Sequence, residues 1–165
     1  MLRLFLILCM VLTFASVSMP AQATVRVEAA DLQGSRPLEE QTGRAAIRDY
    51  LQSWKALTVA LDQNRADLLD PDFVGSARDT LAATIQQQSA LGISTHYQDR
   101  AHDLQVVFYS PEGLSLELVD NVEYDVQLLD HGKVKAIQHE NARYIIVLTP
   151  AEVRWRVRVF QGSPR

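Results

Sequence analysis

The chain has 165 residues, of which 47% are hydrophobic and 22% charged, and its formal net charge is -4. This composition excludes a collagen-like chain, a disulfide-stabilised scaffold, a fully disordered protein and a strongly basic nucleic-acid binder. The length leaves room for one domain of ordinary size.

The first 23 residues have the organisation of a secretory signal peptide. Arg3 supplies a positive charge, and the apolar run at 4–17 is too short to cross about 30 Å of hydrocarbon comfortably. The sequence Ala21-Gln22-Ala23 has the small-x-small pattern at which a signal peptidase cleaves. We therefore expect a periplasmic or secreted protein with no membrane span after cleavage. Cys9 is the only cysteine and lies in the removed segment, so neither disulfides nor thiolate metal sites are expected.

The segment 24–42 has little apolar periodicity, and we interpret it as a flexible leader. From Gly43 to about Asp62 the apolar residues recur at helical spacing, and Thr42 can cap this helix. The stripe on its apolar side consists of Ile47, Tyr50, Leu51, Trp54, Leu57 and Leu61. A helix with such a one-sided stripe has to cover an apolar surface.

Two shorter helices are predicted before Gly92, at Ala66–Leu69 and from Ser76 to about Leu91. After Gly92 the apolar period changes from about 3.6 to about 2, which predicts antiparallel strands. The expected strands are Ile93–Gln98, Leu104–Tyr109, Leu114–Leu129, Val134–Leu148 and Val153–Phe160. The order of elements predicts an α+β fold in which the helices cover one apolar face of an antiparallel meander.

Three pieces of the sequence resemble the nuclear transport factor 2-like superfamily. They are the helix start Ala45–Trp54, the connection Phe73–Gly75, and a final hairpin of Tyr144–Leu148 with Trp155–Val157. The resemblance implies a curved sheet wrapped as a cone around a long first helix. That superfamily includes isomerases, dehydratases, polyketide cyclases, transport adaptors and non-catalytic subunits, so the resemblance implies little about activity.

The resulting domain organisation has four parts. A signal peptide at 1–23 and a flexible leader at 24–42 precede a nuclear transport factor 2-like domain at 43–161, which a tail at 162–165 follows. A polar outer sheet face predicts a monomer or a weak homodimer. Trp54 and Trp155 each lie on an apolar face, and we expect them to be buried close together.

Asp120 interrupts the apolar face of the longest predicted strand. If the strand is regular, its carboxylate points into the cone between Leu118 and Val122 and is a candidate general base. The interpretation that we favour is a β-bulge at Asp120-Asn121, which turns the side chain outward.

Glu140 and Gln138 lie on the same predicted face of the next strand as Tyr144. An arrangement of Glu140 and Asp120 with a tyrosine would suit proton transfer. A change of register places His139 on that face instead, and this is the interpretation that we favour.

His96 and His102 flank a predicted turn at Asp99-Arg100, where they would meet across a hairpin as part of a weak metal site. We expect no metal and, since the sequence has no Gly-rich phosphate loop, no cofactor. The final strand carries a row of arginines, for which we favour a charge ladder with acids of the outer sheet face over an anion-binding surface. The row is Arg154, Arg156 and Arg158, and the acids are Glu117, Glu123 and Asp125.

The functional hypothesis is an exported, non-catalytic module that binds a small apolar ligand or an envelope protein, and not nucleic acid. Its ligand would occupy an apolar pocket in the cone, and the predicted lining is Tyr50, Trp54, Phe108, Tyr124, Tyr144 and Trp155. The alternative is an acid/base enzyme of isomerase, dehydratase or cyclase type, with Asp120 and Glu140 as its catalytic residues.

Overall fold

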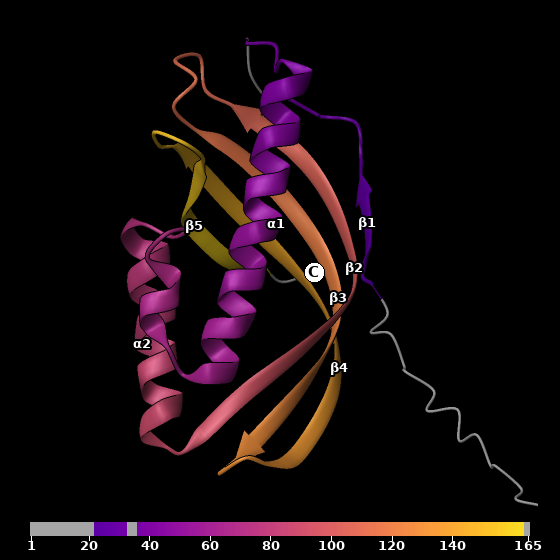
Figure 1. Ribbon diagram of the computed structural model, residues 1–165. Coiled ribbons are helices and arrows are strands. Elements are labelled where there is room, and N and C mark those ends of the chain that lie inside the picture. The colour runs from indigo at the N-terminus through magenta and orange to yellow at the C-terminus, as the bar shows by residue number, and fades with distance from the viewer. Residues whose placement is uncertain (1–21, 33–35, 164–165) are drawn as a thin grey trace, which may run out of the picture.

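The computed structural model describes residues 22–32 and 36–163. Its two layers are a five-stranded sheet in the order β1-β2-β3-β4-β5 and the helices α1 and α2, joined by a short 3-10 helix (Figure 1). The strands are β1 Thr24–Val27, β2 Ile93–Tyr109, β3 Leu116–Asp130, β4 Lys133–Pro150 and β5 Trp155–Ser163. The helices are α1 Glu40–Gln63, α2 Gly75–Ala90 and the 3-10 helix Ala66–Leu69. The α+β prediction is confirmed.

The predicted signal peptide at 1–23 lies almost entirely outside the described residues. Among residues 22–32 and 36–163, no helix combines the length and the apolar composition needed to cross a membrane.

Helix α1 lies along the concave face of the sheet, and α2 lies beside it (Figure 1). The predicted stripe is the face that it buries: Tyr50, Trp54 and Leu57 are almost completely shielded from solvent. Each such side chain stabilises the fold by about 1.5–3 kcal/mol through burial. The helix begins at Glu40, so Thr42 is not its cap. It ends at Gln63 and is capped by Asn64, whose φ of 55° is one that asparagine tolerates.

Strand β2 corrects the sequence prediction of two strands separated by a turn. It is continuous from Ile93 to Tyr109, and a shift of register between Asp99 and Ala101 replaces the predicted turn. Because the extra residue sits in this bulge, Asp99 and His102 both face the inside of the cone, opposite Tyr124 and Val122 of β3. His96 and His102 therefore lie on one strand and do not meet across a hairpin.

Strand β1 lies inside the segment predicted to be a flexible leader. Thr24–Val27 pairs in parallel with β2, and the pairing continues beyond the strand. The Glu28 N–H donates to the Leu104 carbonyl at 2.8 Å, and the Asp31 N–H donates to the Val106 carbonyl at 3.0 Å. The sheet thus begins before the predicted domain boundary at Gly43.

Candidate functional site

The aromatic side chains predicted to line a pocket in the cone pack against one another instead. Trp54 is 3% exposed, and its ring centroid lies 5.2 Å from that of His102 and 5.7 Å from that of Tyr144. Tyr97, Tyr124 and Phe160 complete the rings around the indole. The middle of the cone is therefore occupied by side chains of the protein itself.

Two of the predicted lining residues lie away from this cluster. Phe108 pairs with Glu117, which points to the outer face because its neighbours Leu116 and Leu118 are fully buried inside. Trp155 is half-buried at the start of β5, and its backbone N–H donates to Asp49 Oδ2 at 2.9 Å. The ring contacts of Trp54 do not include Trp155, so the prediction that the two tryptophans are both buried together is wrong.

Asp120 points into the cone and is fully buried. The favoured interpretation of a bulge at Asp120-Asn121 is wrong, since β3 pairs with both neighbouring strands without interruption there. Its Oδ2 accepts two hydrogen bonds of 2.7 Å, one from the Tyr50 hydroxyl and one from His102 Nδ1–H. Its Oδ1 has no hydrogen-bond partner among the described residues.

The charges of this buried group favour an imidazolium. Burial alone would lower the pKa of His102, but Asp120 and Asp99 outweigh it and raise that pKa to about 9. Burial disfavours ionised Asp99, yet His102 and Trp54 hold its pKa below the usual value. The pKa of Tyr50 is raised well above its usual value by burial and by the nearby Asp120. The arrangement of these groups beneath Trp54 therefore favours a positively charged His102 beside Asp120.

Glu140 and Gln138 share the concave face with Tyr124 and Val126, so the favoured change of register is wrong. Glu140 is half-exposed, however, and it pairs with Tyr124, whereas Asp120 pairs with Tyr144. Four residues of strand separate these positions, or about 13 Å. The two predicted catalytic acids are therefore not brought together.

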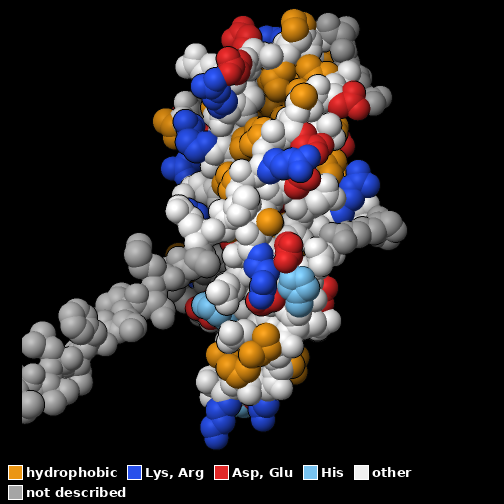
Figure 2. Space-filling model, turned by 90° about the vertical axis from the view of Figure 1, so that its right-hand side faces the viewer, with side chains coloured by type: hydrophobic (Ala, Val, Ile, Leu, Met, Phe, Trp, Pro, Cys, Tyr) orange, Lys and Arg blue, Asp and Glu red, His pale blue; other side chains and the backbone are white. Residues whose placement is uncertain are grey.

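A cavity lies outside the cone interior, between α1, the N-terminal segment, β2 and the turn before β5. Its volume is about 1160 Å³. Apolar side chains come from the N-terminal segment, from α1, from β2 and from the turn before β5, and they are Val27, Ala29, Ala30, Leu38, Ile47, Leu51, Val106 and Val153. We call this cavity the α1 groove. In Figure 2, hydrophobic side chains are visible between charged ones in the upper half of the molecule.

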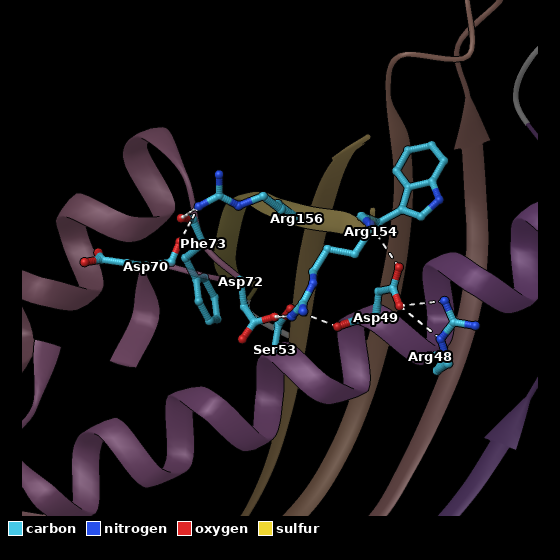
Figure 3. A network of polar contacts seen from close by, with 9 residues as sticks. Arg48, Asp49, Ser53, Asp70, Asp72, Phe73, Arg154 and Arg156 are labelled. Atoms are coloured by element: carbon cyan, nitrogen blue, oxygen red, sulfur yellow. Dashed lines mark hydrogen bonds and ion pairs between the residues drawn. The ribbon is translucent and has the colours of Figure 1, made fainter. Parts of the chain in front are cut away.

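One wall of the α1 groove is the turn between β4 and β5, fixed by a polar network (Figure 3). Arg154 Nη1 donates to Asp72 Oδ1 at 2.9 Å, and Asp49 accepts from both Arg48 and the backbone of β5. Arg156 donates to backbone carbonyls of the connection before α2. Arg154 and Arg156 therefore bind this connection, and the predicted ladder with acids of the outer sheet face is wrong for both.

The charges around the α1 groove are mostly paired. Arg44 pairs with Glu40, Arg48 with Asp49, and Arg154 with Asp72. Lys55 also lines the groove, and it has no ion pair among the described residues. The groove therefore has an apolar floor and a lysine without a direct ion pair, although Lys55 lies near enough to Asp99 to help lower the pKa of that carboxyl.

This groove was not predicted, because its N-terminal wall lies in the segment 24–42 that was expected to be a flexible leader. The signal was present in the apolar residues Val27, Ala29 and Ala30 of that segment. On the helix, Ile47 and Leu51 are four residues apart and half-exposed. Their place at the edge of the predicted stripe indicated a second, partly solvated apolar surface.

Comparison with solved structures shows the class of fold at low sequence identity. The intermembrane space region of the chloroplast protein ARC6 matches with a TM-score of 0.62 and 13% identity, over 79% of this chain and 100% of that chain. A scytalone dehydratase-like protein from Novosphingobium aromaticivorans matches with a TM-score of 0.52 and 11% identity, over 76% of this chain and 89% of that chain. No family model and no curated protein matches the sequence. The chain shares with these structures an α+β fold in which helices pack on a curved, mostly antiparallel sheet, and the likeness extends to the fold alone.

Proposed function

We propose that this protein is an exported, non-catalytic module that binds a small, elongated apolar ligand with an acidic head group in the α1 groove. The observation that carries the proposal is the groove itself, an apolar cavity of about 1160 Å³ beside an aromatic cone interior that is filled. Ligand sites are typically about 300–1,000 Å³, lined mainly by apolar side chains with a few polar groups. A fatty acid has this chemistry.

The placement of Lys55 supports an acidic head group. Lys55 lies one turn along α1 from Leu51, which in turn lies one turn from Ile47. An acyl chain over Ile47 and Leu51 would therefore bring a carboxylate within reach of the ammonium group. Each methylene buried contributes about 0.8 kcal/mol, so the chain supplies affinity and Lys55 supplies orientation.

Displacement of a fluorescent fatty acid by dodecanoate tests this proposal. We expect saturable binding that Leu51→Gln weakens at least about tenfold, because the variant removes apolar contact and places an amide in the groove. Val59→Gln is the matched control, since Val59 is 44% exposed on the same helix but does not line the groove. Absence of binding, or equal effects of both variants, would contradict the proposal.

The head group has its own test. Lys55→Gln is expected to weaken dodecanoate binding by about two- to fivefold, the range of an exposed ion pair, and to leave dodecanol binding unchanged. Equal weakening of both ligands would show that Lys55 does not bind the carboxylate.

Export is part of the same proposal. The apolar run at 4–17 and the sequence Ala21-Gln22-Ala23 support it. Mass spectrometry of protein secreted by a bacterial host is expected to give a chain that begins at Thr24. A cell-retained chain that keeps residue 1 would contradict it.

The buried Asp120 favours a second candidate, an acid/base enzyme of isomerase, dehydratase or cyclase type. A carboxylate with an unpaired oxygen beside a protonated histidine is a proton-transfer group. A substrate would have to displace Trp54, because Asp120 and His102 are 0% and 3% exposed. If a bound ligand is chemically converted by the wild type but not by a folded Asp120→Asn variant, the enzyme replaces the binding module.

A further inference from the structure

One carboxylate on the concave face of the sheet has no cationic partner. Glu140 of β4 is half-buried, and among the residues that the structure describes it makes neither an ion pair nor a hydrogen bond. It pairs with Tyr124 of β3, and Tyr124 pairs on its other side with Asp99 of β2. The Cβ atoms of directly opposed residues lie about 4.5–5.5 Å apart, so this tyrosine stands between two carboxyl groups.

Tyrosine rings lie beside the Glu140 carboxylate. The ring centroids of Tyr97 and Tyr124 are 5.0 Å apart, and the Tyr124 hydroxyl lies 3.3 Å from that of Tyr144. Burial raises the pKa of Tyr97 to about 12, and the charges of Tyr144 and Glu140 add to this rise, which shows that the groups are close together. Tyr97 and Tyr144 are only half-buried. We call Tyr97, Tyr124, Tyr144 and Glu140 the tyrosine mouth.

The positive charge near the tyrosine mouth belongs to Asp99. Burial disfavours the Asp99 carboxylate, but His102, Trp54 and Lys55 hold its pKa below the usual value. The described residues give Glu140 no such basic partner in an ion pair. Because the face of an aromatic ring and a carboxylate both attract positive charge, the tyrosine mouth is complementary to a cation from outside the described part of the chain.

We propose that the tyrosine mouth binds a small quaternary ammonium ion of the choline type, with Glu140 as its counter-ion. Aromatic rings recognise such ligands when the cation lies within about 6 Å of a ring centroid. A quaternary ammonium has no N–H to donate, and this suits a site in which the hydroxyls of Tyr124 and Tyr144 already face each other. None of the four residues lines the α1 groove, so this site is independent of the proposed fatty acid.

The surrounding charges favour a free cation over a lipid head group. A phosphatidylcholine head group carries a phosphate next to its ammonium, and Asp99 and Glu140 on either side of Tyr124 would repel that phosphate. Co-sedimentation with phosphatidylcholine vesicles is therefore expected to leave the protein in the supernatant. Co-sedimentation that free choline abolishes would assign the site to a lipid head group and overturn the proposal.

Isothermal titration calorimetry with choline tests the site. Its neutral probe is the choline analogue in which a tert-butyl group replaces the trimethylammonium group, because the two molecules have the same shape. Choline is expected to bind saturably with a Kd below about 10 mM, and the neutral analogue at least about tenfold more weakly. Absence of saturation by choline, or equal affinity for both probes, would overturn the proposal.

Glu140→Gln tests the counter-ion and keeps the size of the side chain. We expect it to weaken choline binding by about two- to fivefold and to leave the weaker binding of the neutral analogue unchanged. Glu117→Gln is the matched control, because it removes the same charge from the outer face of β3, where the neighbouring Leu116 and Leu118 point inward. Equal effects of the two variants on choline binding would refute a direct role for Glu140.

A pair of variants at Tyr97 tests the ring. Tyr97→Phe keeps the aromatic face and is expected to bind choline within about twofold of the wild type, whereas Tyr97→Leu is expected to weaken binding at least about fivefold. Urea unfolding and circular dichroism check that both variants are folded. Equal affinities of the two variants would contradict recognition of the cation by the ring of Tyr97.

Discussion

His102 is a buried residue whose pKa lies well above its ordinary value. Its ring packs edge-to-face against the indole of Trp54. Burial disfavours the charged imidazole, but Asp120 and Asp99 favour it more strongly. A buried ion pair of this kind contributes stability only while both partners are charged. Its contribution therefore depends on pH.

The stability of the protein is expected to fall between about pH 6.5 and pH 9. The pKa of His102 is about 9 in the folded state and 6.5 ordinarily, so below pH 6.5 the imidazole is charged in both states and its stabilisation is complete. Between these values only the folded chain keeps the proton, and the free energy of unfolding decreases by at most about 1.4 kcal/mol per pH unit. Urea unfolding across this range measures the slope.

His102→Gln is expected to remove that slope, while His96→Gln, on an exposed site of the same strand, retains it. An unchanged slope in His102→Gln would show that the imidazole is not the group that titrates. A nuclear magnetic resonance titration of the His102 ring would then identify its actual protonation state.

Asp49 and Arg48 are adjacent in sequence, but we expect Asp49 to contribute more to the free energy of unfolding. Asp49 is buried and accepts the Trp155 N–H, whereas the Arg48 side chain is 71% exposed. Asp49→Ala leaves that N–H without its acceptor and should destabilise the fold by about 1–3 kcal/mol. Arg48→Ala should cost less than about 1 kcal/mol. Equal losses in urea unfolding would contradict the role given to Asp49.

Strand β1 is the element that the sequence concealed most completely. It is short and exposed, with no alternation of buried and exposed residues along it. Its partner, β2, begins 65 or more residues later, and a pairing over such a distance leaves no local pattern in the sequence. By contrast, α1, β3 and β4 were predictable because each has a periodic apolar face over many residues.

Amide hydrogen exchange tests β1 directly. The amides of Glu28 and Asp31 donate to β2 carbonyls. They are expected to exchange more slowly than the amides of Arg36 and Leu38, which flank Pro37. Exchange of Glu28 and Asp31 at the rate of an unstructured peptide would show that the N-terminal segment is a flexible leader after all. The N-terminal wall of the α1 groove would then be absent in solution.

The candidate site could likewise be predicted only in part from local sequence. The sequence of β3 alone shows that Asp120 interrupts an apolar face. The contact between Asp120 and His102 depends on the bulge in β2. Without the extra residue, Asp99 and His102 would point to opposite faces of the sheet. The α1 groove depended on β1 and on the β4–β5 turn, both held by contacts between residues distant in sequence.

At the scale of the whole molecule, the interior of the cone is filled with side chains, and the apolar α1 groove lies at the surface. The cone holds Trp54 and a buried histidine–carboxylate pair. The α1 groove lies outside this filled interior.

The central claim is that the ligand binds outside the cone, and methyl-resolved nuclear magnetic resonance tests it most directly. On titration with dodecanoate, the methyl signals of Ile47 and Leu51 are expected to shift, while those of the fully buried Leu118 and Ile146 stay in place. Shifts confined to Leu118, Ile146 and their neighbours would place the ligand in the cone and contradict the account.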